Sequence, residues 1–409
     1  MLILEFYLPP TKIKDFKKTL FVTIIEVKPD ANLVLIFLII SIISNLNLTK
    51  MNNNFIKAIG LMSGTSMDGI DVALIESDGF SLKRENKFLF YPYPKLFQIK
   101  LQKLISKPAL DSKLSLDVTK ELTEFHIEAV QKFLLKYNLK SEDIDLVGFH
   151  GHTILHKPEE KLTWQIGDIK LLEERLQIKI MGDLRNIDVQ KGGQGAPLAP
   201  IYHHALIRDL IDEDIIFMNL GGVANITYVT KDENKMIAGD ICFANAPLND
   251  MVFRKLGQNF DKNGDIARKG QINQELANKF LKLDFFYKKF PKSIDRNEFN
   301  SHLKDFDKLE LSDALATLIY ILVESVNKSL DLLPAKVKKI IISGGGANNI
   351  FMIEQISKIT GLEILDAKNF NINIDSVEAE LFAFLAIRVF YNLPFSFSGT
   401  TGCNTNFHL

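Results

Sequence analysis

Two segments of the same kind, one in each half of the chain, constrain its fold more than any other sequence feature. Each joins two short apolar runs through a turn of small residues, at residues 59–71 and again at residues 219–227. The turn glycines are Gly64 in the first segment and Gly221 in the second. A hairpin repeated in this way predicts two related α/β lobes that face each other across a cleft.

The rest of the chain alternates between strand and helix patterns. Strands are expected at residues 56–60, 71–76, 144–149 and 179–181, and helices at residues 116–137 and 171–176. In the longer helix, apolar residues such as Leu122, Phe125 and Ala129 recur at three- and four-residue intervals, which is typical of one buried face. This alternation predicts the α/β class, with sheets flanked by helices.

The first fifty residues differ from the rest of the chain. Their apolar run, residues 33–43, is eleven residues long, whereas a membrane-spanning helix needs about 20. It also begins too far from the N-terminus for a secretory signal. We interpret residues 1–50 as a non-native extension or weak apolar segment before a start at Met51. A membrane tether through residues 31–48 is the alternative, and N-terminal mass spectrometry separates the two.

We expect a first lobe over residues 51–180 and a second lobe over residues 181–409. The C-terminal helix should pack back on the first lobe. The 49 basic and 50 acidic residues nearly balance, so the chain lacks the basic field that nucleic-acid binders use. Its two cysteines, Cys242 and Cys403, cannot build a disulfide framework or a cysteine-rich zinc module. A reducing compartment, the cytoplasm, is therefore expected.

The turn from Gly64 to Asp71 combines glycines, hydroxyls and carboxylates, which suits phosphates and a divalent cation. Glycine lets backbone N–H groups approach an anion, and Asp68 or Asp71 could lie near Mg²⁺. The segment matches neither the P-loop nor the dinucleotide motif. A plain tight hairpin is the alternative. A third glycine cluster, residues 344–346, follows an apolar strand at residues 337–342, where a base and ribose could lie on the backbone.

Asp183 is the candidate general base, because it follows a predicted strand and precedes the glycine-rich loop at residues 191–197. It could take a proton from water or a hydroxyl if closing lobes raise its pKa. The alternatives are a turn cap or a partner for Arg185. Asp188 is a weaker candidate of the same type.

Three histidines lie close together between residues 150 and 156. Strand alternation would put His150 and His152 on one face, as a metal site requires. Zinc would need further ligands, and no cysteine or interleaved acidic residue supplies them, so a structural or substrate-contact role is favoured. Stoichiometric zinc in purified protein would instead favour a hydrolase.

From about residue 56 onward, the chain resembles the bacterial anhydro-N-acetylmuramic acid kinases. These belong to the actin-like, sugar-kinase and heat-shock ATPase superfold. The resemblance rests on residues 60–71, 150–158, 165–168, 182–185, 192–200, 219–227, 291–293 and 343–348. It implies two actin-like lobes with a central cleft, each built on a mixed β-sheet flanked by helices.

The resemblance also implies ATP and Mg²⁺ as cofactors. The nucleotide contacts it implies are Gly64, Thr65, Ser66, Met67, Asp68, Gly69, Ile70, Asp71, Gly221, Gly222, Asn225, Gly344, Gly345 and Gly346. Mg²⁺ would arrive with ATP rather than in a cage of protein ligands. The implied sugar contacts are His150, His152, Arg185, Lys292, Arg296 and Glu378.

In the reaction that the resemblance implies, Asp183 activates a water that opens the 1,6-anhydro ring of 1,6-anhydro-N-acetylmuramic acid. The freed O6 takes the γ-phosphoryl group of ATP, which gives N-acetylmuramic acid 6-phosphate and ADP during cell-wall recycling. We expect Arg185 to pair with the lactyl carboxylate of the sugar. A homodimer is possible, and neither a nucleic-acid partner nor stable membrane insertion is expected.

This chain departs from the family pattern in three places. Residues 240–245 lack a hydroxyl and two glycines that the family usually has, His152 replaces a glutamine, and residues 293–297 differ. Asp240, Asn245, Lys292 and Arg296 are retained. The alternative function is therefore a catalytically weakened sugar- or nucleotide-binding regulatory protein, which calorimetry would reveal as ligand binding without ADP release.

Overall fold

The computed structural model describes residues 54–64, 66–294, 299–365, 367–370, 372–373 and 375–403. The chain divides into a unit that ends at Phe55 and a compact unit that begins at Ile56, and the description below concerns the second unit. The interpretation of residues 1–50 lies outside the described residues. Within the described ranges, no helix combines the length and the apolar character that a membrane crossing requires.

The first half of the compact unit forms a five-stranded sheet in the order β3-β2-β1-β4-β7. β1 pairs antiparallel with β2, and β2 with β3, whereas β4 pairs parallel with both β1 and β7. The strands are β1 (Ile56–Met62), β2 (Gly69–Ser77), β3 (Leu82–Pro92), β4 (Leu146–Phe149) and β7 (Lys179–Gly182). The sequence pattern did not indicate β3, because charged residues interrupt the alternation of apolar and polar residues in this edge strand.

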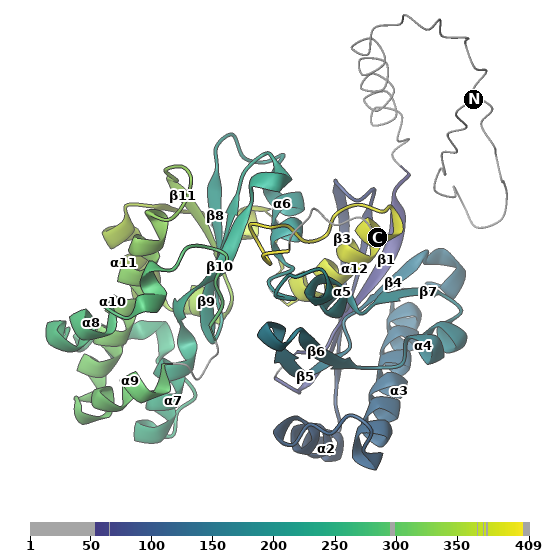
Figure 1. Ribbon diagram of the computed structural model, residues 1–409, viewed down its shortest axis with the longest axis horizontal. Coiled ribbons are helices and arrows are strands. Elements are labelled where there is room, and N and C mark those ends of the chain that lie inside the picture. The colour runs from purple at the N-terminus through teal and green to yellow at the C-terminus, as the bar shows by residue number, and fades with distance from the viewer. Residues whose placement is uncertain are drawn as a thin grey trace, which may run out of the picture. The chain divides into compact units, whose positions relative to one another are not determined.

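The second half repeats this topology in the order β10-β9-β8-β11-β12, again with three antiparallel strands followed by two parallel ones. The strands are β8 (Ile215–Leu220), β9 (Val223–Val229), β10 (Ile237–Phe243), β11 (Lys339–Ser343) and β12 (Glu363–Leu365). Figure 1 shows the two sheets with their helices. The duplicated order confirms the expected two-lobed α/β fold on mixed sheets.

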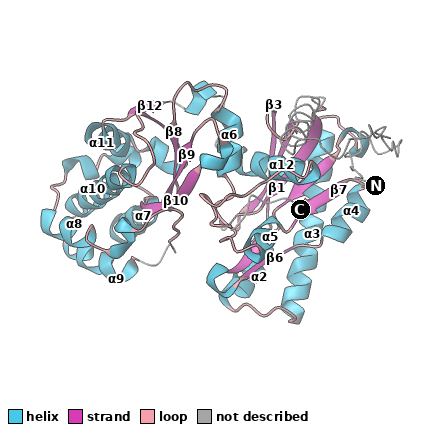
Figure 2. Cartoon of the chain, turned by 45° about the horizontal axis from the view of Figure 1, so that its top comes forward, coloured by secondary structure: helices cyan, strands magenta, loops and turns pink. Residues whose placement is uncertain are grey.

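Helices cover both sheets, and the expected helices at 116–137 and 171–176 are confirmed as α3 and α4. The first-half helices are α2 (Lys95–Ser106), α3 (Lys113–Lys136), α4 (Ile169–Leu176), α5 (Leu184–Gln190) and α6 (Pro200–Ile207), with a hairpin of β5 (His152–Lys157) and β6 (Leu162–Ile166). The second-half helices are α7 (Asn245–Leu256), α8 (Gln274–Phe280), α9 (Asn300–Leu303), α10 (Leu311–Leu330) and α11 (Ile350–Thr360). Figure 2 shows the strands between these helices.

The last helix, α12 (Val377–Phe390), lies directly on the first sheet, along β1, β2 and β4. Gly60 of β1 and Gly148 of β4 are register partners, and they give the helix backbone room to approach. A Cβ atom at Gly60 would lie 1.7 Å from the Ala379 carbonyl oxygen, and one at Gly148 would lie 1.9 Å from that of Phe382. Only glycine fits at either position.

α12 also connects the two halves of the compact unit. The buried Arg388 guanidinium donates to the Gly79 carbonyl oxygen (3.0 Å) between β2 and β3, and it pairs with Glu233 (2.9 Å) between β9 and β10. One apolar core includes residues of α12 together with Ala58 of the first sheet and Phe217 of the second. The two sheets therefore share packing through this helix.

The glycine contact yields a stability prediction. Gly148→Ala should lower the free energy of unfolding by about 3 kcal/mol or more, because its methyl group would overlap the α12 backbone. Gly361→Ala is the matched control: its position is open, with a φ of 70°, so we expect a loss of about 1 kcal/mol. Urea unfolding measures both, and equal losses would contradict the close approach of α12.

Candidate functional site

The turn between β1 and β2 carries the predicted phosphate contacts. Met67 takes a left-handed conformation with a φ of 56°, and its N–H donates to the Gly64 carbonyl oxygen (3.1 Å). The Ser66 hydroxyl donates to Asp68 Oδ1 (2.5 Å). A Cβ atom at Gly64 would meet only side-chain atoms, at 3.8 Å or more, so one face of this turn is open. Thr65 lies outside the described residues.

A group of carboxylates surrounds the end of this turn. Asp71 pairs in register with Met62 where β1 ends, and its side chain is half-buried. Burial, and then the neighbouring charges of Glu378, Asp68 and Asp375, raise the pKa of Asp71 to about 7. Desolvation of its carboxyl also raises the pKa of Glu378, the second residue of α12, although the residue as a whole is exposed. The site therefore concentrates negative charge that a cation would stabilise.

The second and third glycine clusters lie against each other. A Cβ atom at Gly344, whose φ is 80°, would lie 2.4 Å from Asn219 Oδ1, so the turn after β11 packs on the β8–β9 turn. The Asn245 amide joins them, because its Nδ2 donates to the carbonyl oxygens of Leu220 (2.8 Å) and Gly221 (2.9 Å).

Gly345 and Gly346 lie beside the Asn245 amide, where their added Cβ atoms would come within 3.9 and 3.2 Å of Nδ2. Gly221 and Gly222 keep an open face, since nothing comes nearer than 3.5 Å to a Cβ atom there. Asn225 of β9 pairs in register with Asn219 and with Asp240. The second and third glycine clusters that the sequence singled out thus lie next to each other.

Asp183 directly follows β7 in a left-handed conformation with a φ of 61°. Its side chain is exposed, makes no capping bond to α5, and accepts a hydrogen bond from Asn186 Nδ2 (3.1 Å). Asp183 therefore does not cap α5. It is not the partner of Arg185 either, because the Arg185 guanidinium is bonded to other groups. A non-glycine residue held in this backbone region costs free energy, which is common where a side chain must be aimed.

Arg185 is held by three neighbours. Its Nε donates to His150 Nε2 (2.8 Å), its Nη1 donates to the Gly195 carbonyl oxygen (2.9 Å), and its guanidinium lies 6.0 Å from the Phe382 ring centre. His150 donates from Nδ1 to the Gly151 carbonyl oxygen (2.9 Å). Burial, and then the Arg185 charge, lower the pKa of His150 well below its usual value, so the ring stays neutral and can accept from Arg185.

The two histidines do not share one strand face, and that expectation was wrong. Gly151 has a φ of 72°, so the chain turns between His150 at the end of β4 and His152 at the start of β5. His152 Nδ1 instead meets the Ser63 hydroxyl (2.8 Å). Across the described part of the chain, no three His, Cys, Asp or Glu side chains are gathered closely enough to hold a metal ion.

Lys292, a predicted sugar contact, lies in largely apolar surroundings. Lys292 is buried: its Nζ donates to the Phe285 carbonyl oxygen (3.1 Å) and lies over the rings of Phe285 (4.7 Å) and Phe290 (5.2 Å). Its ammonium therefore faces a phenylalanine cluster. Asp240 contacts the same segment, since its Oδ2 accepts from the Ile294 N–H (2.9 Å). Arg296 lies outside the described residues.

Asp188, the weaker base candidate, has a structural role. It is fully buried, and it accepts hydrogen bonds from the Gly195 N–H (2.6 Å) and the Thr401 hydroxyl (2.8 Å). Its carboxylate therefore ties the glycine-rich loop to the C-terminal segment. The paired glycines of that loop are the feature of the sequence that could have indicated this contact, because a Cβ atom at Gly193 would lie 2.2 Å from Asp188 Oδ2.

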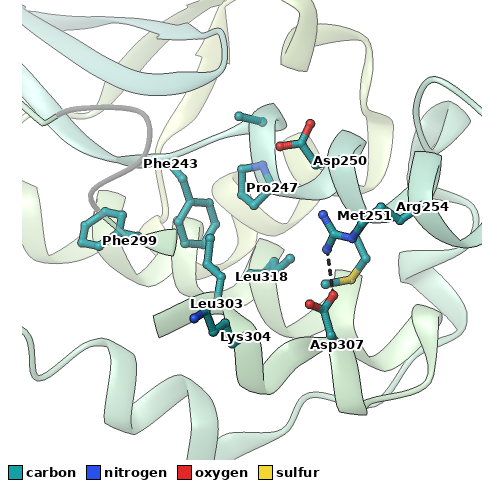
Figure 3. A pocket seen from close by; sticks show the side chains of 11 residues that line it. Phe243, Pro247, Asp250, Met251, Arg254, Phe299, Leu303, Lys304, Asp307 and Leu318 are labelled. Carbon is teal, nitrogen blue, oxygen red and sulfur yellow. Dashed lines mark hydrogen bonds and ion pairs between the residues drawn. The ribbon is translucent and has the colours of Figure 1, made fainter. Parts of the chain in front are cut away.

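A cavity of about 210 Å³ lies beside α7, and its lining residue Ala246 is 3.6 Å from a Cβ atom placed at Gly222. Figure 3 shows that apolar residues such as Phe243, Met251 and Leu318 share its lining with charged residues. Arg254 and Asp307 form an ion pair (2.7 Å) in its wall. Sequence reasoning missed this cavity, because its walls come from helices far apart in the chain.

Comparisons with known proteins match the part of the chain described above. The family model described as anhydro-N-acetylmuramic acid kinase matches residues 56–409. A protein of that name from Zymomonas mobilis is 39% identical over 84% of this chain and 96% of its own length. One from Bradyrhizobium diazoefficiens is 38% identical over 84% of this chain and 95% of its own.

Two solved structures show lower sequence identity to this chain. Component A of the (R)-2-hydroxyglutaryl-CoA dehydratase of Acidaminococcus fermentans is 12% identical, with a TM-score of 0.41, over 81% of this chain and 99% of its own. A glucokinase of the ROK family from Streptomyces griseus, solved with glucose and AMPPNP, is 12% identical over the same shares, with a TM-score of 0.35. The family assignment rests on the sequence relatives.

The raised pKa of Asp71 gives a prediction about pH. Its carboxyl binds a proton more tightly in the folded chain than in the unfolded chain, so its contribution to stability is lost as pH rises from about 4 to about 7. Asp71→Asn removes this loss and should raise Tm by a few °C at pH 8, roughly the effect of 1 kcal/mol, but by much less at pH 4.

Thermal unfolding at the two pH values makes the comparison. The control is Asp232→Asn, which removes an exposed carboxyl whose pKa is lowered by hydrogen bonds to Asn234 and should bring no gain at pH 8. An equal Tm shift for Asp71→Asn at pH 4 and pH 8 would contradict the charge crowding.

Proposed function

This chain belongs to the anhydro-N-acetylmuramic acid kinase family, and from that premise we propose that it acts on 1,6-anhydro-N-acetylmuramic acid. It uses ATP and water to give N-acetylmuramic acid 6-phosphate and ADP, a step in the reuse of cell-wall material. The observation that carries this proposal is the match over residues 56–409, which contains both glycine hairpins, Asp183 and Arg185. A match over 96% of a kinase relative favours the enzyme over the regulatory alternative.

The residues around the β1–β2 turn fit a magnesium nucleotide. The crowded charge at Asp71 is what a nearby divalent cation would relieve, and the open face of Gly64 leaves room for phosphate oxygens. We assign Asp68 and Asp71 to the cation side, and the backbone at Gly221–Gly222 and Gly344–Gly346 to the nucleotide. Bound Mg²⁺ supplies neutralisation of the charge on the phosphates during transfer.

Asp183 is the proposed general base. Its carboxylate takes a proton from a water while the water oxygen bonds to the anomeric carbon of the sugar. The bond between that carbon and O6 breaks, and O6 forms the new bond to the γ-phosphorus as ADP leaves. The left-handed backbone at Asp183 and its bond to Asn186 support this role, because they fix the carboxylate while leaving it exposed.

Arg185 is proposed to bind the lactyl carboxylate of the sugar. Its Nε and Nη1 are occupied by His150 and the Gly195 carbonyl, which fixes the plane of the guanidinium. A fixed planar cation suits a carboxylate better than a mobile one. Arg185→Lys should therefore raise the KM for the sugar about tenfold or more, the scale of a charged hydrogen bond. An unchanged KM would count against this role.

The protein is also proposed to act in the cytoplasm and to form a homodimer. Cys242 and Cys403 are buried and do not form a disulfide, which suits a reducing compartment. Fractionation of cells tests the location, and sedimentation tests the dimer.

The base assignment gives the main activity prediction. Asp183→Asn should lower kcat about a hundredfold or more, the scale for losing a general base, with ATP affinity and Tm near those of the parent. ADP release with Mg-ATP and the anhydro sugar measures this. Asp209→Asn, which removes an exposed carboxylate beside Arg208, is the control and should turn over normally. Turnover by Asp183→Asn within threefold of the parent would exclude Asp183 as the base.

A further inference from the structure

We propose that Tyr93 and His152 are positioning residues that hold both ends of the β1–β2 turn through a buried chain of hydrogen bonds. This inference rests on the proposed function for its kinetic test. It concerns residues that no motif marked as a pair: Tyr93 follows β3, and His152 begins β5.

Tyr93 contacts the turn at two points. Its hydroxyl donates to Ser63 Oγ (2.8 Å), and its backbone N–H donates to the Asp68 carbonyl oxygen (2.8 Å). The turn that contains Gly64 is thus closed by one residue from another strand. The Tyr93 ring is itself fixed, because it packs against Phe97 (4.9 Å between ring centres) and Phe125 (5.7 Å).

His152 completes the chain from the other side. Its Nδ1 lies 2.8 Å from Ser63 Oγ, and Ser63, Tyr93 and His152 are 1%, 4% and 1% exposed. Water therefore cannot replace these bonds easily, and the Ser63 hydroxyl has both of its partners fixed by the fold.

The proton positions follow from the partners. With Tyr93 donating to Ser63 Oγ, we infer that the Ser63 proton goes to His152 Nδ1, which places the proton of His152 on Nε2. His126 and His150 differ, since each Nδ1 meets a carbonyl oxygen, that of Leu122 (2.8 Å) or Gly151, and must donate to it. His152 is therefore the opposite tautomer of its two histidine neighbours.

His152 stays neutral in this position, because burial lowers its pKa to about 4. Its Nε2–H is buried and has no partner among the described residues, and the same holds for His126 Nε2, which is an acceptor. The two histidines are neighbours, since the charge of one lowers the pKa of the other.

This arrangement predicts an effect confined to the nucleotide side. Loosening the chain should let the β1–β2 turn move, so ATP binding weakens while sugar binding does not. Tyr93→Phe removes only the hydroxyl and keeps the ring and the backbone bond. His152→Leu removes the acceptor for Ser63, whereas the amide oxygen of His152→Gln can restore it.

Steady-state kinetics with each substrate varied in turn provides the test. We expect Tyr93→Phe and His152→Leu to raise the KM for ATP about fivefold, the scale of one hydrogen bond, and Tyr93→Phe to change the KM for the sugar less than twofold. His152→Gln should return it to within about twofold of the parent. The control is His203→Leu. His203 is another buried histidine, and its Nδ1 lies 3.0 Å from the Thr227 hydroxyl, so this substitution should lower Tm without changing KM. An unchanged KM for ATP in both Tyr93→Phe and His152→Leu would overturn the proposal.

Two measurements keep the inference separate from the proposed activity. Calorimetry with Mg-ATP alone should give a Kd about fivefold weaker in Tyr93→Phe, and an equal Kd would refute the positioning role even in a chain that never turns over. ¹⁵N NMR of the histidine rings, assigned with single variants, should find the proton of His152 on Nε2 and those of His126 and His150 on Nδ1. A proton on Nδ1 of His152 would contradict the inferred donation from Ser63 to His152.

Discussion

The rest of the site depends on the backbone contact between α12 and the first sheet. Gly60 and Gly148 sit side by side in β1 and β4, and only their missing side chains let Ala379 and Phe382 lie so close. This contact fixes where α12 begins, and so brings Glu378 to the carboxylates of the β1–β2 turn. The same helix carries Arg388 to the second half of the unit. A packing constraint between backbones therefore sets the electrostatics of the site.

The candidate site concentrates negative charge, which a bound cation would stabilise. Burial and neighbouring carboxylates oppose the ionisation of Asp71, so the magnesium nucleotide proposed for this site would relieve a cost that the fold already bears. Arg185 stays ordered through His150, a ring kept neutral so that it can accept the guanidinium proton. Rigid neighbours of this kind lower the entropy lost on binding.

Local sequence patterns predicted the elements beside the glycine turns well, because alternating apolar strands and small-residue turns are short-range signals. They failed where long-range packing decides. The pair His150 and His152 was expected on one face, but the positive φ of Gly151 turns the chain. The family resemblance, rather than a local pattern, predicts a sugar contact at Lys292, and its place among phenylalanine rings depends on tertiary structure that a local pattern does not show. Tyr93 belongs to no motif, since its importance comes from its place after an edge strand.

The most direct test of the account is to identify the product. The purified chain is incubated with Mg-ATP and 1,6-anhydro-N-acetylmuramic acid, and the sugar is analysed by mass spectrometry while ADP is counted. We predict ADP in equal amount to the sugar consumed, and a product heavier than the substrate by one phosphoryl group and one water. ADP and free phosphate beside an unchanged sugar, or a phosphorylated sugar with its anhydro ring intact, would contradict the account.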